Sequence, residues 1–151
     1  MLTTFFASLL IWVMIGGLVL LWVIDGRVKK EEALHAAFSS ISAWIISKMV
    51  KDIFPVSRPF VSNGDAVSTV TIPQDGAFPS SHTAIAFAIA TTIWLHNRRL
   101  GFWFFLAAVL TGLGRVLANV HFPTDVIGGA VLGVVTALIF DKLHVFKLVG
   151  K

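Results

Sequence analysis

Apolar stretches separated by short polar junctions set the pattern of this chain, and five of them are expected to be membrane-crossing helices. The first runs from Leu2 to Ile24 almost without interruption, and a spanning helix takes about 20 apolar residues. The second carries Ser, Lys and His among its Ile and Trp residues, so we expect it to pack inside a bundle. The pattern predicts an all-α transmembrane helix bundle of about five spans, at residues 2–24, 32–54, 80–96, 100–120 and 124–141.

One long polar segment, residues 55–79, separates the second predicted helix from the third. It contains four prolines together with Asn63-Gly64 and Asp75-Gly76, all of which favour turns. The piece from Val67 to Ile72 mixes Val with Ser and Thr, which fits either a short strand or a segment on the membrane interface. Loops of this length in compact domains are usually functional or disordered. We therefore interpret residues 55–79 as the active-site loop.

The composition supports the membrane interpretation. Hydrophobic residues make up 56% of the 151 residues and charged residues only 13%, whereas charged residues make up about 25% of soluble proteins. We therefore expect an integral membrane protein with a single domain over residues 1–151. The net charge is +4, but the basic residues form no patch interleaved with aromatics, so no nucleic-acid partner is expected. Cysteine is absent, which excludes disulfides and thiolate metal sites.

The basic residues also predict an orientation. If the first helix ends inside the cell, eight of the 12 basic residues lie on the cytoplasmic side, as the positive-inside rule requires. These eight are Arg27, Lys29, Lys30, Arg98, Arg99, Lys142, Lys147 and Lys151. The other four, Lys48, Lys51, Arg58 and Arg115, fall at the opposite face, where the rule expects few. The protein is thus expected to be a multi-pass plasma-membrane protein whose active site faces outside.

Polar residues from three distant junctions are expected to meet at that outer face. They are Lys51, Asp52, Arg58, Ser80, Ser81, His82, Arg115, His121 and Asp125. One lysine and two arginines supply enough positive charge to bind a phosphate or pyrophosphate, and guanidinium groups suit bidentate contacts to oxygen. Ser80 and Ser81 begin a helix, whose backbone N–H groups and dipole also favour an anion. We interpret Asp52 only as a charge balance for Lys51.

Two histidines in this set have complementary predicted roles. His121 precedes Asp125 by four residues, so the carboxylate can orient the imidazole and favour its charged form, which makes His121 a candidate nucleophile. His82 is a candidate general acid for the leaving oxygen and, afterwards, a general base for water. The result is two-step phosphoryl transfer through a phosphohistidine. The three cations would neutralise charge in place of a metal ion, so neither a metal nor a cofactor is expected.

Three motifs in this order resemble a known family signature: Lys51-x6-Arg58-Pro59, Pro79-Ser80-Ser81-His82 and Arg115-x5-His121-x3-Asp125. The signature is that of the type 2 phosphatidic acid phosphatase superfamily, metal-independent lipid phosphatases related to vanadium haloperoxidases. The matching segment covers about half of the chain. The resemblance implies that His121 is the nucleophile, Asp125 its partner and His82 the acid/base. It also implies four phosphate ligands, which are Lys51, Arg58, Ser80 and Arg115.

The chain departs from the family pattern in three respects. Ser81 stands where the family usually has glycine, and we keep it among the phosphate-binding residues because the helix start supplies N–H groups in either case. Gly114 stands where the family usually has serine, which removes one hydroxyl contact. The family commonly has six spans and we expect five, with the missing one N-terminal to every motif.

Other conspicuous residues have structural explanations. His35 and His96 lack a charged partner at motif spacing and are expected to be packed or interfacial residues. Lys48 lies one helical turn before Lys51 and either attracts an anionic substrate or extends its charge to the interface. Gly129 and Gly133 form a face of small residues typical of close helix packing.

The sequence therefore predicts an integral membrane lipid phosphatase that acts on a phosphomonoester or a pyrophosphate, with undecaprenyl pyrophosphate as the favoured substrate. Phosphatidylglycerophosphate or phosphatidate is the alternative substrate. An alternative of another class is a non-catalytic phospholipid-binding membrane protein. A vanadate haloperoxidase is disfavoured because that chemistry needs no bilayer. The expected partners are a membrane lipid phosphate and the bilayer, and the sequence sets no oligomeric state.

Overall fold

The computed structural model describes residues 1–24 and 27–143. For residues 27–30 it describes the backbone only. Of the basic residues assigned to the cytoplasmic side, Lys147 and Lys151 lie outside the described residues, and Arg27, Lys29 and Lys30 are described by their backbone alone. Within the described part the chain is helical and contains no strand, so the all-α prediction is confirmed. Residues 67–72 accordingly form a loop without a strand.

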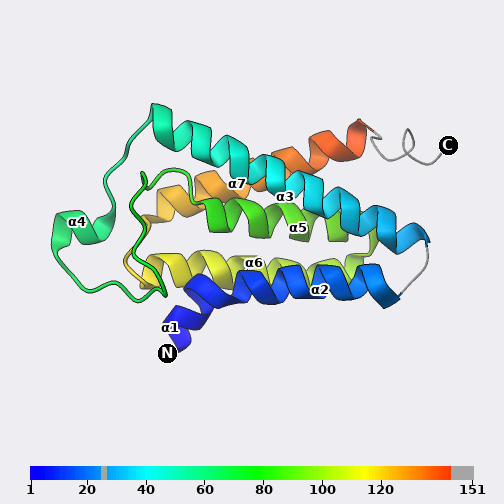
Figure 1. Cartoon of the computed structure of the whole chain (residues 1–151), viewed down its shortest axis with the longest axis horizontal. Helices are drawn as coiled ribbons and strands as arrows, with labels where there is room; N and C mark the ends of the chain where they lie inside the picture. The colour runs from blue at the N-terminus through cyan, green and yellow to red at the C-terminus, as the bar shows by residue number, and fades with distance from the viewer. Residues whose placement is uncertain (25–26, 144–151) are drawn as a thin grey trace.

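The helices run lengthwise, side by side (Figure 1). The first is continuous over α1 (Leu2–Thr4), the π-helical turn η1 (Phe5–Leu9) and α2 (Leu10–Ile24). The others are α3 (Arg27–Ile53), the short α4 (Pro59–Asn63), α5 (Ser81–His96), α6 (Arg98–Leu117) and α7 (Pro123–Lys142). Four segments are long and apolar enough to cross a membrane: Leu2–Ile24, Glu31–Ile53, Arg98–Leu117 and Pro123–Lys142.

The helix α5 is the centre of the bundle and contacts α3, α6 and α7. It has 16 residues, fewer than the roughly 20 that a full crossing takes. Most of its residues are buried, and many are alanines, so neighbouring helices approach its backbone closely. On α7, Gly129 and Gly133 face the backbone oxygens of Ser80 and Ala84, as expected for closely packed small residues. This contact fixes the start of α5 against the start of α7.

Large apolar side chains cover the outside of the bundle. Exposed examples include Trp12 on α2, Ile41 on α3, Trp103 on α6 and Val131 on α7. So large an apolar surface is typical of helices that face lipid. Several polar side chains of these helices are instead buried, among them Ser39, Ser47, Thr111 and Thr136.

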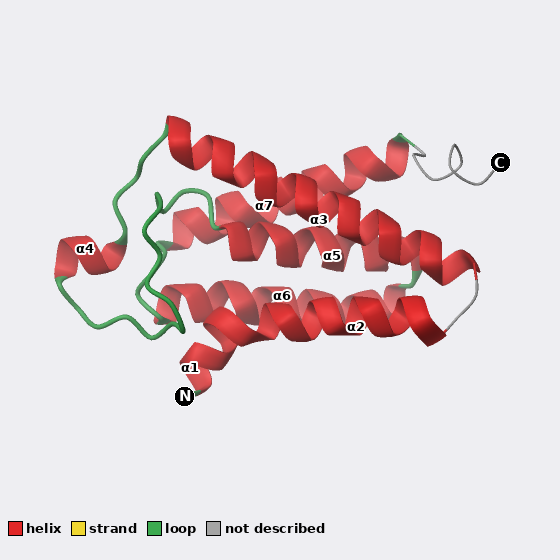
Figure 2. Cartoon of the chain, in the orientation of Figure 1, coloured by secondary structure: helices red, strands yellow, loops and turns green. Residues whose placement is uncertain are grey.

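The loop from residue 54 to residue 80 lies across one end of the bundle (Figure 2). It carries α4, which ends at Gly64 with a φ of +72°, a conformation that favours glycine. Asn63 and Asn119 exchange side-chain hydrogen bonds of 3.0 and 3.1 Å, and Ser68 N donates to Ala118 O at 3.2 Å. The loop is thereby bound to the connection between α6 and α7, so all three motif-bearing junctions meet at one end (Figure 1).

Candidate active site

Three buried cations lie together at the loop end of the bundle. Lys51 comes from the last turn of α3, Arg58 precedes Pro59 at the start of α4, and Arg115 comes from the last turn of α6. Each is at most 4% exposed. Buried cations are costly unless charged or polar partners compensate them, so their partners define the site.

Arg58 uses all five of its N–H groups on protein atoms. Its Nε donates to Asp75 O at 2.8 Å, and Nη2 donates to Asp75 Oδ1 at 2.7 Å and to Gly76 O at 3.1 Å. Its Nη1 donates to Val120 O at 2.8 Å and lies 3.2 Å from His121 Nε2. A guanidinium has five donors and no acceptor. Arg58 is therefore fully occupied in this conformation and joins the loop to the α6–α7 connection.

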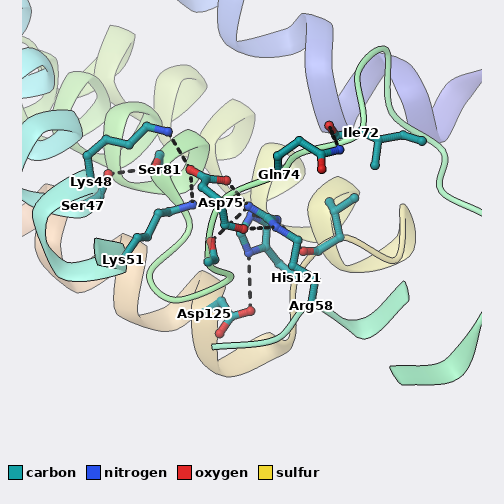
Figure 3. Close-up of polar contacts among 12 residues, drawn as sticks. Ser47, Lys48, Lys51, Arg58, Ile72, Gln74, Asp75, Ser81, His121 and Asp125 are labelled. Atoms are coloured by element: carbon teal, nitrogen blue, oxygen red, sulfur yellow. Dashed lines mark hydrogen bonds and ion pairs between the residues drawn. The ribbon is translucent and has the colours of Figure 1, made fainter. Parts of the chain in front are cut away.

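Asp75 is the common anion of this cluster, as Figure 3 shows. Its Oδ2 lies 2.6 Å from Lys48 Nζ and 3.2 Å from Lys51 Nζ, while its Oδ1 pairs with Arg58. Burial acts to raise the pKa of Asp75, but its bonds with Lys48, Lys51 and Arg58 outweigh burial and hold that pKa well below its usual range. Asp75 is therefore a carboxylate held by three cations.

The imidazole of His121 lies next to the carboxylate of Asp125, the residue that the sequence predicts as its partner. Nδ1 of His121 lies 3.4 Å from Asp125 Oδ2, an ion-pair distance that is longer than a well-made hydrogen bond. The same Oδ2 accepts from Phe122 N at 2.8 Å, which fixes the carboxylate at the start of α7. Because Arg58 can only donate, Nε2 accepts, and the neutral ring carries its proton on Nδ1, toward Asp125. The lone pair of Nε2 therefore points into the cation cluster.

Burial decides the charge of His121. Burial and the nearby Arg115, Arg58 and Lys51 lower its pKa to about 4, although Asp125 acts to raise it. Asp125 does favour the charged imidazole, as expected, but burial and the three cations outweigh it. The ring is neutral near pH 7, which is the form that a nucleophilic nitrogen needs.

The start of α5 contributes Ser80, Ser81 and His82. Ser81 Oγ accepts a 2.8 Å hydrogen bond from Ser47 of α3, and His82 lines the same cavity as His121. Ser80 lies behind the cavity wall, where its N–H donates to Asp125 O at 2.9 Å and its Oγ accepts from Thr83 at 3.0 Å. The bond from Ser80 to Asp125 joins the N-terminal ends of α5 and α7, from which His82 and Asp125 come.

Arg115 is the least satisfied cation of the site. Its Nη1 donates to Ala7 O of the first helix at 3.0 Å, but its buried Nε has no hydrogen-bond partner. Unpaired buried donors are uncommon and costly. Arg115 also lines the cavity described below, so a guanidinium with an unused donor is suited to an anionic ligand there.

These groups surround a cavity of about 390 Å³. Six of the eight predicted site residues line it: Lys51, Arg58, Ser81, His82, Arg115 and His121. Asp125 and Ser80 lie behind that wall. Trp44 and Ile85 add an apolar side to the cavity.

Of the residues that line this cavity, Asp75 has no assigned part in the prediction and Lys48 has only an open one. Asp75 was interpreted only as a turn former, and the balance of Lys51 was given to Asp52, which is exposed, whereas Asp75 is the partner of Lys51. For Lys48 the sequence allows either substrate attraction or an interfacial position, and the structure shows it in contact with Asp75. One sequence signal could have identified Asp75. The loop end carries more cations than carboxylates, so a loop carboxylate is needed as their partner.

Comparisons with known proteins agree with this arrangement. A family model described as the PAP2 superfamily matches residues 32–147, which include all three motifs. The chain is 30% identical over 127 residues to the undecaprenyl-diphosphatase BcrC of Bacillus subtilis (strain 168), with 83% of this chain and 64% of that protein covered. It is 28% identical over 134 residues to the bacitracin transport permease protein BcrC of Bacillus licheniformis, with 89% and 66% covered.

A solved structure has the same fold. The crystal structure of LpxE from Aquifex aeolicus matches with a TM-score of 0.72 and 30% identity, over 87% of this chain and 77% of that one. The chain spans about two thirds of the length of the two BcrC proteins. Because the family model covers most of the chain and contains every residue of the cation and histidine cluster, the chain belongs to the PAP2 superfamily.

Proposed function

We propose that this protein is an integral membrane lipid phosphatase that works through a phosphohistidine on His121. The observation that carries the proposal is the position of the His121 Nε2 lone pair, which lies 3.2 Å from Arg58 Nη1 in a cavity with further cations. A nucleophilic nitrogen beside a phosphate-binding guanidinium is the arrangement that phosphoryl transfer needs. The apolar side of the cavity suits a substrate that remains in the bilayer.

The proposed reaction has two steps. Nε2 of His121 attacks phosphorus, and Asp125 stabilises the positive ring that forms by accepting from Nδ1. The bond from phosphorus to the leaving oxygen breaks, and His82 donates a proton to that oxygen. His82 then takes a proton from water, which attacks the phosphohistidine, releases phosphate and restores His121.

The phosphate ligands are proposed to be the three buried cations and the start of α5. Arg115 is the best prepared of them because its Nε is buried and has no partner. Lys51 and Arg58 must exchange contacts with Asp75 for contacts with the substrate. Ser80 and Ser81 supply the helix start. We propose that these groups stabilise the transition state without a metal ion.

A lipid diphosphate is the proposed substrate class. The BcrC of Bacillus subtilis, which is similar to this chain, is named an undecaprenyl-diphosphatase, so undecaprenyl pyrophosphate is the first candidate. A cavity of about 390 Å³ with four cations on its wall has room for a diphosphate. Phosphatidylglycerophosphate and phosphatidate are the alternative substrates to compare in the same assay.

The site is further proposed to face outside the cell. Arg98, Arg99 and Lys142 lie at the end of the bundle opposite the loop that carries α4 (Figure 1). The positive-inside rule favours a cytoplasmic position for that end. Lys51, Arg58 and Arg115 lie at the opposite end and are exceptions to the positive-inside rule. They are buried and bound to protein partners.

The test is phosphate release by the purified protein in detergent with excess chelator. We expect release from lipid phosphates, and we expect His121→Ala to lower the rate by more than about a thousandfold. Arg98→Gln, an exposed residue at the far end, is the control and should retain the rate of the unchanged protein.

Two outcomes would contradict the proposal. If the unchanged protein released no phosphate from any lipid, the protein would be a phospholipid-binding protein that lacks turnover. If His121→Ala retained the rate, the nucleophile would be another group.

A further inference from the structure

The guanidinium of Arg58 separates two anion positions. Its Nη1 side faces His121 Nε2 at 3.2 Å, where the proposed reaction places the phosphoryl group that is attacked. Its Nη2 side binds Asp75 Oδ1 at 2.7 Å. Asp75 therefore marks a second place at which an anionic oxygen is bound, next to the first (Figure 3).

Lys48 and Lys51 complete this second position. They lie 2.6 and 3.2 Å from Asp75 Oδ2, so a single carboxylate is bound by two lysines and one arginine. Three positive charges around one negative charge leave a surplus that a more highly charged anion would neutralise better. A phosphate oxygen accepts the same charge-assisted hydrogen bonds as a carboxylate oxygen.

We propose, on the basis of the proposed function, that Lys48, Lys51 and the Nη2 side of Arg58 form a second phosphate subsite, which takes the lipid-linked phosphate of a diphosphate. The terminal phosphoryl group then lies at His121. Lys48 is a specificity-determining residue of this subsite, because its partner Asp75 lies on the Nη2 side of Arg58, whereas His121 lies on the Nη1 side.

The depth of the two positions determines which phosphate lies in each. The side chain of His121 is 1% exposed, whereas that of Lys48 is 44% exposed. Trp44 and Ile85 add apolar surface to the wall of the same cavity. The phosphate that is joined to the lipid chain therefore belongs at Lys48, and the terminal one reaches His121.

This arrangement gives the lysines a part in the first bond change. His121 Nε2 forms a bond to the terminal phosphorus, and the bond from that phosphorus to the bridging oxygen breaks. The electron pair stays on the bridging oxygen, which leaves as part of a lipid monophosphate. Lys48 and Lys51 stabilise the charge that develops there. Water then hydrolyses the phosphohistidine and releases inorganic phosphate.

Asp75 must leave the subsite before a diphosphate binds. All five N–H groups of Arg58 are in use, and three of those bonds go to residues 75 and 76. An incoming diphosphate therefore competes with Asp75 for the same donors. Removal of this carboxylate charge is expected to strengthen diphosphate binding.

The test compares a polyprenyl diphosphate with the monophosphate of the same polyprenol. Lys48→Gln is expected to lower kcat/KM about tenfold for the diphosphate, the loss of one charge-assisted hydrogen bond, and less than about twofold for the monophosphate. Arg98→Gln, which removes the same charge at the far end, should change neither value. An equal loss with both substrates would overturn the subsite, because general charge attraction would then explain it.

Asp75→Asn provides an independent measurement. We expect inorganic pyrophosphate to inhibit this variant at a concentration about tenfold lower than it inhibits the unchanged protein. A higher or unchanged inhibitory concentration would mean that Asp75 only braces the loop, which would contradict the proposed competition.

Direct binding separates this inference from the proposed function. Calorimetric titration with inorganic pyrophosphate and with inorganic phosphate needs no turnover, and Lys48→Gln should weaken only pyrophosphate. If no lipid were hydrolysed but this difference were found, the proposed function would fail and the subsite would stand. If hydrolysis occurred and both ligands were weakened equally, the subsite alone would fail.

Discussion

His121 illustrates how surroundings set the chemistry of a residue. Its Nδ1 faces Asp125, its Nε2 faces Arg58, and its side chain is almost fully buried. The carboxylate acts to raise its pKa, but burial and three nearby cations act in the opposite direction and have the larger effect. A histidine beside an aspartate is therefore not charged by that contact alone.

We expect the imidazole of His121 to titrate at about pH 4. The measurement is the ¹⁵N chemical shift of labelled histidine in detergent micelles, with the signal assigned through His121→Asn. A midpoint near the ordinary histidine pKa of 6.5 would contradict the buried neutral ring.

The same shift predicts a dependence of stability on pH. Between pH 6.5 and 4, His121 binds fewer protons in the folded protein than in the unfolded protein. Its contribution to the free energy of unfolding is therefore complete above pH 6.5 and is lost as the pH falls toward 4. His121→Asn should lack this part of the pH dependence.

At the scale of elements, the packing of α7 against α5 positions the site. Ser80 N donates to Asp125 O, which joins the N-cap of α5 to the first turn of α7. Gly129 and Gly133 let the two backbones approach, because a Cβ at Gly133 would meet Ala84 O and Ala88 N. His82 and Asp125 come from different helices, so their relative position depends on this contact.

Gly133→Ala is expected to destabilise the bundle by about 1–3 kcal/mol, because a methyl group there would overlap backbone atoms. Gly16→Ala is the matched control: nothing lies within 4 Å of its Cβ, and it should change stability by less than about 1 kcal/mol. Thermal unfolding in detergent measures both. Equal stability of the two variants would mean that α7 can move away from α5 without cost.

At the scale of the whole molecule, the two ends of the bundle differ in chemistry. One end carries the long loop and the buried cations, and the other carries the exposed Arg98 and Arg99 at the start of α6. The difference in basic residues supports the proposed orientation, with the loop outside the cell.

The natural absence of cysteine allows a direct test of this orientation. A cysteine at Ser68, exposed in the loop, is expected to react with a membrane-impermeant maleimide on intact cells. A cysteine at Arg99, exposed at the far end, should react only after the cells are permeabilised. The opposite pattern would place the site in the cytoplasm and would contradict the external substrate.

The sequence by itself determined the helices and the residues of the three motifs. Apolar stretches of about 20 residues have few alternatives to a membrane helix, because lipid leaves backbone groups no partner outside the chain. The motif residues lie at the ends of these helices. Because consecutive helices cross the membrane in opposite directions, these ends come together at one face. Six of the eight predicted site residues line one cavity for this reason.

Only the tertiary structure decided which charges meet. Lys51 pairs with Asp75, 24 residues away, and not with its neighbour Asp52, because the side chain at residue 52 points out of the bundle. The neutral state of His121 likewise depends on burial by distant segments, which spacing does not encode. Electrostatic partners are set by proximity in space and by exclusion of water, and both arise only when the loop closes over the end of the helices.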